Sequence, residues 1–300
     1  MFLFGKEVPS QTEIAMWPYV VSEDIALLLS AWGQAQDFSI PCESYFSSWR
    51  EEMTDTMHCL FPHYRRVEER EMVDGLSHLI ARIGLPVLSL DGVYIRADLS
   101  LEIARQVNER GEDAGLGSRP GTPSLRHQLR TIQQSGLKEV LLADDVIFSG
   151  SLIEHVCRVL ARLDIRVPVI CAGVGIGEGV NKLVCHGKEV RCVKMFDQVI
   201  DEVCERDFVP GVPQSGRALR GEDRVGIPYL FPFGDPVRWA SIPEVHAASF
   251  STFCLAHAIR LFEEIEHLSG KPVRCCDLTR VPVGLPQDET RFVDALRASL

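Results

Sequence analysis

The sequence has little positive charge and no long apolar run. Its 31 lysines and arginines are outnumbered by 42 aspartates and glutamates, so the formal net charge is -11. A chain of this charge repels a phosphate backbone, and no Lys/Arg-rich run with interleaved aromatics offsets the repulsion locally. No stretch reaches the roughly 18 apolar residues of a membrane-spanning helix. We therefore expect neither nucleic acid nor a membrane as a partner.

Signals for export, disulfide bonding and serine hydrolysis are also missing. The opening segment MFLFGKEVPS begins apolar, but Lys6, Glu7 and Pro9 interrupt it before a signal-peptide core could form. The ten cysteines form no CxxC pair, which favours reduced, mostly buried thiols over a disulfide framework. No serine lies in a GxSxG elbow. These absences predict a cytoplasmic protein without a hydrolase triad.

Helical patterns dominate residues 1–84. Ser22 is placed to cap a helix over IALLLSAW that ends near Gly33, and a second apolar stripe at helical spacing runs from about 67 to 83. From residue 85 to about 200, short apolar runs alternate with amphipathic helices, which is typical of a parallel sheet covered by helices. The expected strands are PVLSL, KEVLLA, VPVICAGV and EVRCVKM.

We therefore predict an α/β protein with a mainly parallel sheet flanked by helices, in three regions. Residues 1–84 form an N-terminal helical extension, residues 85–200 the α/β core, and residues 201–300 a C-terminal hood packed on that core. Between the first two strands we expect a helix near Ser100 and a polar loop, NERGEDAGLGSRPGTPS. A long helix is expected from about 250 to 268, and a shorter one from about 288 to 299.

One segment combines the features of a phosphate and sugar site. In KEVLLADDVIFSGSLIEHVCRVL, a buried-strand run ends in Asp144 and Asp145, and a small-residue turn then feeds an amphipathic helix. Ligands bind at the carboxyl ends of strands in open α/β sheets, and a turn before a helix offers N–H groups to a phosphate. Gly150 allows the main chain to approach closely. The acid pair either binds a hydroxyl-rich ligand such as a ribose or simply faces solvent.

VLLADDVIFSGS resembles the signature of type I phosphoribosyltransferases, which bind 5-phosphoribosyl-1-pyrophosphate (PRPP). The resemblance covers about residues 85 to 199. It implies that Asp144 and Asp145 hold the ribose hydroxyls. The following turn would bind the 5′-phosphate, through Val146, Ile147, Phe148, Ser149, Gly150 and Ser151.

The rest of the resemblance is weaker. No clear pyrophosphate loop follows the first core strand in LSLDGVYIRADLS, where Asp91 and Arg96 are candidates; Arg119 is either a pyrophosphate ligand or a solvated arginine. Phe148 stands where the 6-oxopurine branch has an aspartate, which argues against a hypoxanthine-type mechanism. RDFVPGVPQSGR is similar to that branch's base-binding segment and nominates Phe208 for stacking.

Further aromatics in the C-terminal region form either a base-holding hood or a packing cluster: Tyr229, Phe231, Phe233 and Trp239. The resemblance implies a glycosyltransferase of nucleotide metabolism that transfers the 5-phosphoribosyl group of PRPP to a small acceptor and releases pyrophosphate. Mg²⁺ would enter through PRPP rather than through direct protein ligands, and a homodimer is expected. The alternative is a regulator with the same fold that binds PRPP or a nucleotide without chemistry.

Overall fold

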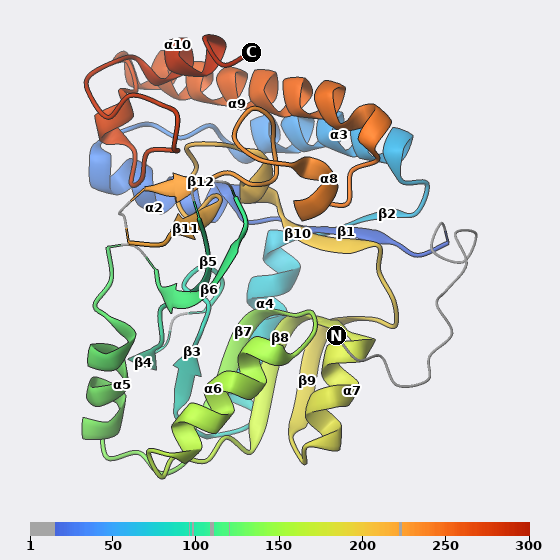
Figure 1. The fold of residues 1–300 in the computed structure, drawn as a ribbon, viewed down its shortest axis with the longest axis vertical. Coiled ribbons are helices and arrows are strands. Elements are labelled where there is room, and N and C mark those ends of the chain that lie inside the picture. Colours follow the sequence, from blue (N-terminus) through green and yellow to red (C-terminus); the bar gives the residue numbers. More distant parts are fainter. Residues whose placement is uncertain (1–15, 96, 98, 109–110, 120, 222–223) are drawn as a thin grey trace.

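The structure of the chain is a computed structural model that describes residues 16–95, 97, 99–108, 111–119, 121–221 and 224–300. Arg96 therefore lies outside the described residues. Figure 1 shows an α/β body at the bottom, a helical body at the top, and two smaller sheets between them. Within the described part of the chain, no helix is both long and apolar enough to cross a membrane.

A five-stranded parallel sheet forms the lower body. Its strands lie in the order β4 (Leu99–Ser100), β3 (Val87–Ser89), β7 (Leu141–Ile147), β8 (Val169–Ile176) and β9 (Glu189–Phe196). All eight residues of β8 are buried, which explains its continuous apolar run, because helices cover both faces of such a sheet. The predicted α/β class and all four predicted strands are confirmed.

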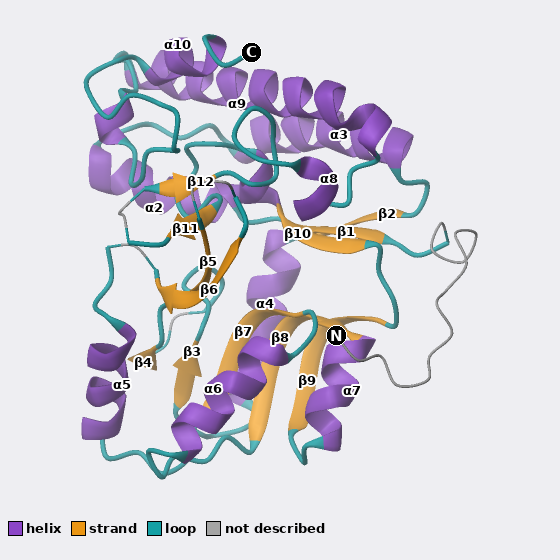
Figure 2. Ribbon diagram, in the orientation of Figure 1, coloured by secondary structure: helices purple, strands orange, loops and turns teal. Residues whose placement is uncertain are grey.

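Helices on the two faces of the sheet bury separate hydrophobic clusters (Figure 2). One face packs against α5 (Leu125–Gln134), α6 (Ser151–Ala161) and α7 (Gly177–Cys185) through residues such as Ile132, Val156 and Leu183. The other face packs against α4 (Glu69–Ala81) through Met72 and Leu76. The apolar stripe predicted from 67 to 83 is thus the stripe that covers this sheet.

A second, three-stranded sheet joins distant parts of the chain. Strand β1 (Tyr19–Ser22) lies between β10 (Asp201–Cys204) and β2 (Tyr64–Val67), and all three are parallel. Above it, one hydrophobic cluster is shared by α2 (Ile25–Gln36), α3 (Glu43–Leu60), α9 (Ala247–Ser269) and α10 (Phe292–Arg297). These contacts cross the boundaries that we predicted at residues 84 and 200.

The third sheet corrects a prediction. Where we expected a helix near Ser100, the chain forms β4 and then β5 (Ile103–Val107), which pairs antiparallel with β6 (Asp113–Ser118). This sheet continues through β11 (Arg217–Leu219) to β12 (Val225–Gly226). The pairing with distant β11 outweighs local propensity here. The polar loop is therefore mostly a hairpin beside the main sheet.

Short elements complete the chain, namely the helix α8 (Pro236–Trp239) and three 3₁₀ turns, η1 (Glu205–Phe208), η2 (Glu244–His246) and η3 (Cys275–Asp277). We predicted that Ser22 caps α2, and this is wrong. Ser22 is the last residue of β1, and its hydroxyl donates to the carboxylate of Glu202. Asp24 is the N-cap residue, and α2 continues past Gly33 to Gln36. All ten cysteines are free, as expected, although only four are buried.

Candidate functional site

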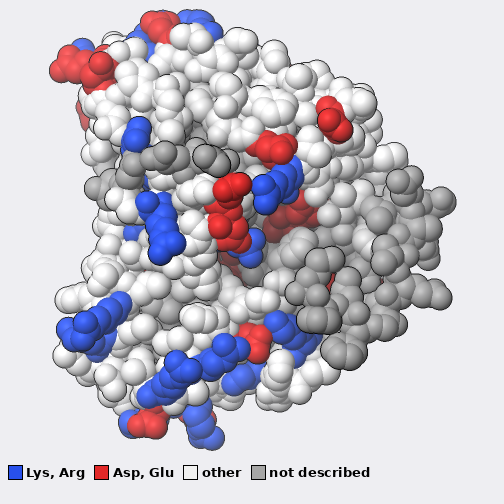
Figure 3. Space-filling view, in the orientation of Figure 1, with Lys and Arg blue, Asp and Glu red and all other residues white. Residues whose placement is uncertain are grey.

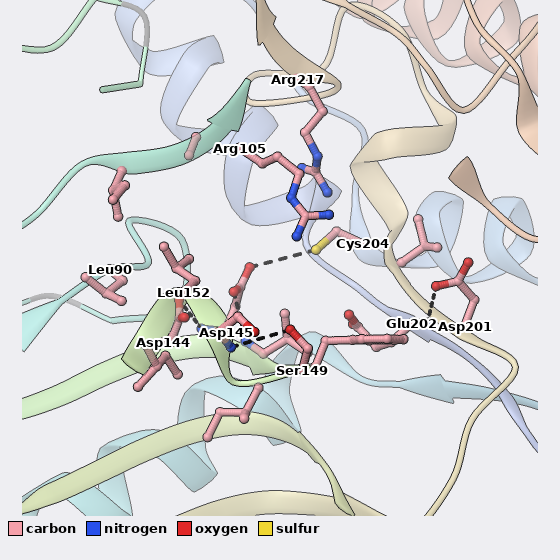
Figure 4. A pocket seen from close by; sticks show the side chains of 18 of the residues that line it. Leu90, Arg105, Asp144, Asp145, Ser149, Leu152, Asp201, Glu202, Cys204 and Arg217 are labelled. Atoms are coloured by element: carbon pink, nitrogen blue, oxygen red, sulfur yellow. Dashed lines mark hydrogen bonds between the residues drawn. The ribbon is translucent and has the colours of Figure 1, made fainter. Parts of the chain in front are cut away.

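The acid pair lies beside a cavity of about 400 Å³ between β7 and the segment from β10 into η1 (Figure 4). Asp144 and Asp145 line it, together with the whole turn that follows, residues 146–151. In the space-filling view, acidic and basic side chains gather in the middle of the face, between the levels of α6 and α9 (Figure 3). The pair and the turn predicted to bind PRPP therefore share one cavity.

The turn after β7 is shaped by two glycines. Gly150 has φ +69, in the left-handed region that side chains disfavour, and it is the N-cap residue of α6. A Cβ on Gly150 would stand 2.9 Å from the carbonyl oxygen of Gly179 at the start of α7. A Cβ on Gly179 would in turn stand 2.2 Å from the carbonyl oxygen of Phe148. The turn is thus packed directly on the next helix.

This turn presents donors to the cavity. The first N–H groups of α6 have no intrahelical acceptor, and together with the helix dipole they favour an anion at this end. The Ser151 hydroxyl lies 3.1 Å from Nζ of Lys182, which is also paired with Glu154 at 2.9 Å. Phe148, 43% exposed, is the one large apolar side chain of the turn that faces outward. An anion at the α6 terminus would meet both N–H groups and a lysine.

The two carboxyl groups of the acid pair have different electrostatic surroundings. Burial raises the pKa of Asp144 well above its ordinary range, and the charges of Asp145 and Asp91 raise it further. Burial also opposes the charge of Asp145, but the guanidinium groups of Arg206 and Arg119 outweigh it and lower the pKa of Asp145. Burial and the neighbouring charges therefore shift the pKa values of the two carboxyl groups in opposite directions.

Two arginines reach the acid pair from distant segments. Arg206, in η1, places its guanidinium 3.4 Å from Oδ2 of Asp145. Arg119, just after β6, donates to the carbonyl oxygen of Leu90 at 3.1 Å and pairs with Glu102 at 3.2 Å. Arg119 thus stands at the end of β3, beside the loop where a pyrophosphate was expected. It is neither solvated nor unpaired.

The wall opposite the turn mixes acids, arginines and aromatics. It is lined by Asp201, Glu202, Cys204, Arg206, Arg217, Tyr229, Arg238 and Trp239, with Arg105 from β5 beside them. Burial raises the pKa of Glu202 to about 8 and that of Asp201 to about 6. The Cys204 thiol lies 3.8 Å from Asp145 Oδ2 (Figure 4).

The stacking role predicted for Phe208 is wrong for this structure. Its side chain is fully buried and packs edge to face on Phe250, with ring centroids 5.2 Å apart, and on Tyr229 at 6.5 Å. Since Phe208 does not line the cavity, no face of its ring is open to a ligand. Tyr229 and Trp239 line the cavity and also contact each other, at 6.0 Å. They contribute to packing and to the cavity wall at once.

Sequence reasoning missed most of this wall. Arg206 stands two residues before Phe208 in RDFVPGVPQSGR, the segment singled out for its aromatic residue. Arg105 lies on β5 and Arg217 on β11, two short strands that pair with each other in parallel. A lone arginine has no periodicity that marks it as a ligand, so only the spatial arrangement could identify these residues.

In the loop after β3, the side chain of Asp91 is hydrogen-bonded within the loop itself. The buried carboxylate of Asp91 accepts from the N–H groups of Val93, at 3.0 Å, and Tyr94, at 2.7 Å. Burial and the charge of Asp145 raise the pKa of Asp91 to about 6. Among the described residues, no group of three His, Cys, Asp or Glu side chains is arranged to hold a metal ion.

The chain matches no protein-family model, and no curated protein matches it in sequence. Solved structures that resemble it include orotate phosphoribosyltransferase from Aeropyrum pernix, at 16% identity over 41% of this chain and 68% of that one, with a TM-score of 0.24. Adenine phosphoribosyltransferase from Thermoanaerobacter pseudethanolicus is 14% identical over 42% and 79%, with a TM-score of 0.26.

Another is orotate phosphoribosyltransferase from Mycobacterium tuberculosis in complex with inorganic phosphate, 11% identical over 42% and 69%, with a TM-score of 0.26. These three structures are phosphoribosyltransferases. They are members of the family that VLLADDVIFSGS resembles. The match covers less than half of this chain, and its TM-scores are below 0.3.

Proposed function

We propose that this protein binds PRPP at the end of β7 and transfers its 5-phosphoribosyl group to a small acceptor with release of pyrophosphate. The observation that carries the proposal is one continuous arrangement. An acid pair, a glycine turn and the N-terminus of an 11-residue helix line the same cavity. A ribose 5-phosphate is a ligand whose diol suits the acids and whose phosphate suits the helix terminus.

Asp145 and Asp144 would bind the ribose hydroxyls. A carboxylate accepts hydrogen bonds from hydroxyl groups, and a carboxyl group whose pKa is raised, as that of Asp144 is, can also donate one when it holds its proton, so the pair suits a diol that both donates and accepts. A negative charge beside the sugar also favours the positive charge that develops at the anomeric carbon as pyrophosphate leaves. The pair would thus orient the sugar and stabilise the transition state.

The arginines would bind the leaving group. Arg119 stands at the end of β3 and Arg105 on β5, and both line the cavity. Planar guanidinium groups bind phosphate oxygens in a bidentate manner. PRPP would enter as its Mg²⁺ complex, since Mg²⁺ prefers phosphate and water oxygens as ligands. Within this arrangement the cation belongs to the substrate, and the chain supplies the surrounding charges.

The acceptor would lie against the opposite wall. Glu202, whose pKa is raised to about 8, and Tyr229 line that side of the cavity. A carboxyl group with a pKa near the working pH suits proton exchange with an acceptor nitrogen. The identity of the acceptor depends on this wall, which differs in residue types from the turn that binds the phosphate.

A second candidate is a protein that binds PRPP or a nucleotide without chemistry. The loop after β3 favours it, because the carboxylate of Asp91 is occupied by the N–H groups of Val93 and Tyr94 within the loop itself. A pyrophosphate ligand would then depend on the arginines alone. Binding with no turnover on any acceptor would support this candidate.

Calorimetry of PRPP with Mg²⁺ tests the shared half of both candidates. The two single variants of the acid pair should differ, because the pKa of Asp144 is raised, which favours its neutral form, and that of Asp145 is lowered, which favours its charged form. We expect Asp145→Asn to abolish measurable binding, whereas Asp144→Asn, which imitates the protonated form, should weaken it only about tenfold or less. Unchanged binding by Asp145→Asn would refute the site.

Turnover then separates the enzyme from the binding protein. Purified protein would be incubated with PRPP, Mg²⁺ and a panel of nitrogen-containing bases and small amines, and pyrophosphate release would be followed. Release that depends on an acceptor supports transfer. Tight PRPP binding without release on any acceptor supports the second candidate instead.

A further inference from the structure

A chain of buried charges runs from Asp145 into the N-terminal part of the protein. The side chain of Arg206 is 4% exposed and that of Asp24 is fully buried. The Arg206 guanidinium is paired with Asp24 on one side and with Asp145, at 3.4 Å, on the other. The main-chain N–H of Arg206 donates to Asp24 as well, at 3.0 Å. Arg206 therefore cannot move without breaking contacts with Asp24.

The same network continues away from the cavity. Glu205 accepts from the N–H groups of Asp24 and Ile25, both at 3.4 Å. The guanidinium of Arg50, on α3, donates to both oxygens of Glu205, at 2.8 and 2.9 Å. The η1 turn that carries Arg206 is thus attached to two N-terminal segments at once.

A network of buried charges is not the most stabilising way to join two segments. Apolar residues of similar size often stabilise a fold as well or better, because desolvation offsets much of the attraction between ions. Buried Nε of Arg206 also lacks a hydrogen-bond partner among the described residues, although Arg206 lines the cavity. Arg206 therefore lies at the cavity wall with its hydrogen bonds directed to the two aspartates rather than through every donor of its guanidinium.

We propose that Arg206, held in place by Asp24, is a positioning residue for the carboxylate of Asp145. This inference rests on the function proposed above and specifies how the sugar-binding acid is prepared. The N-terminal segment would thus support the site through Asp24, although Asp24 does not itself line the cavity.

The hydrogen bonds of Asp145 show how this would work. Oδ1 accepts from the N–H of Val146 at 2.8 Å, and Oδ2 faces Arg206 and the Cys204 thiol. A carboxylate can accept about four hydrogen bonds in all, so one position or more remains for a ribose hydroxyl. Arg206 fixes the rotation of the carboxylate and keeps it ionised while leaving that position open.

Several other charged groups face Asp145 and must be held constant in a test. Asp144 adjoins it on β7, Arg119 approaches from β6, and Glu202 and Cys204 lie on β10. Asp91 faces it from the loop after β3. Arg206 and then Arg119 are the cations that lower the pKa of Asp145, so removing Arg206 takes away the stronger of the two.

The decisive measurement follows the titration of Asp145 without any ligand. Protein labelled with ¹³C at aspartate carboxyl carbons gives one signal per residue, and the Asp145 signal is identified by its loss in Asp145→Asn. We expect Arg206→Gln to move the Asp145 titration to higher pH by about one unit or more. PRPP affinity at pH 7.5 should fall roughly 10- to 100-fold.

Two further variants guard against misfolding. Arg206→Gln alone leaves Asp24 buried without its cation, so Arg206→Gln combined with Asp24→Asn removes both charges and should fold more stably. It should show the same shift and the same loss of affinity. Arg206→Lys keeps the positive charge on a shorter side chain and should recover part of the affinity for PRPP.

The matched control is another arginine on a buried carboxylate, remote from the cavity. Arg291 donates through Nε to both oxygens of Glu266, at 3.1 and 3.0 Å, and neither residue lines the cavity. Arg291→Gln should lower the unfolding temperature while leaving the Asp145 titration and PRPP affinity unchanged.

The outcomes separate this inference from the proposed function. The positioning role is overturned if the pKa of Asp145 is unchanged both in Arg206→Gln and in Arg206→Gln combined with Asp24→Asn. It is also overturned if that pKa shifts while the affinity for PRPP stays at the wild-type value. If the wild-type protein binds no PRPP, the proposed function fails. The titration alone then decides whether Arg206 controls the charge of Asp145: a shift supports that control, and its absence overturns it.

Discussion

Gly150→Ala should damage the phosphate turn in two separable ways. Gly150 has φ +69, and placing an L side chain in that region costs about 1–2 kcal/mol. The new Cβ would also stand 2.9 Å from the carbonyl oxygen of Gly179, which is main chain and cannot rotate away. Overpacking of this kind typically costs about 1–3 kcal/mol. The variant should therefore lose roughly 2–5 kcal/mol of stability.

Gly270 is the matched control, because it isolates the first effect from the second. It has φ +65 at the end of α9, and a Cβ there would meet nothing within 4 Å. Gly270→Ala should therefore lose only about 1–2 kcal/mol. Urea unfolding measures both variants, since the change in midpoint at constant slope reports stability.

Binding measurements complete the comparison. Relief of the contact with Gly179 must displace the turn that presents N–H groups to the phosphate, so PRPP or inorganic phosphate should bind Gly150→Ala at least about tenfold more weakly. Gly270→Ala should bind like the wild-type protein. Equal stability losses in the two variants, or full phosphate affinity in Gly150→Ala, would refute the reasoning.

Two further predictions concern Glu202, in the cavity wall, and Lys182, beside the start of α6. Burial raises the pKa of Glu202 to about 8, so its proton stabilises the fold fully below about pH 4.5, and this contribution is lost as the pH rises through 8. Glu202→Gln should flatten that decline in unfolding midpoints between pH 5 and 8.5; parallel declines would contradict the assignment. Lys182→Met removes the cation beside the Ser151 hydroxyl and should weaken phosphate binding roughly threefold to fivefold at low salt. Arg158→Met, which removes the other partner of Glu154, should not, and equal effects of the two would exclude a direct role for Lys182.

Most of the main sheet could be predicted, because four of its strands are marked by the residues within each strand and the turns beside it. Three of the four expected runs are short and mainly apolar, which is the pattern of a strand buried on both faces. The fourth, EVRCVKM, mixes charged and apolar residues and forms the edge strand β9. The three-stranded sheet could not be predicted in the same way. Its strands have four residues each, and β1 and β10 are paired across about 180 positions of the chain. The helix expected near Ser100 failed because pairing with β11 decided the conformation of that segment.

By itself, the sequence determined one half of the site. Asp144, Asp145, the glycine turn and the helix after it are consecutive, so strand, turn and helix signals place them together without reference to anything distant. Only the tertiary structure decided what faces them. Arg206 reaches Asp145 from 61 residues away and is itself held by Asp24, 182 residues before it. Charges that meet through space leave no local pattern, which is why the sequence nominated Phe208 and not Arg206, two residues before it.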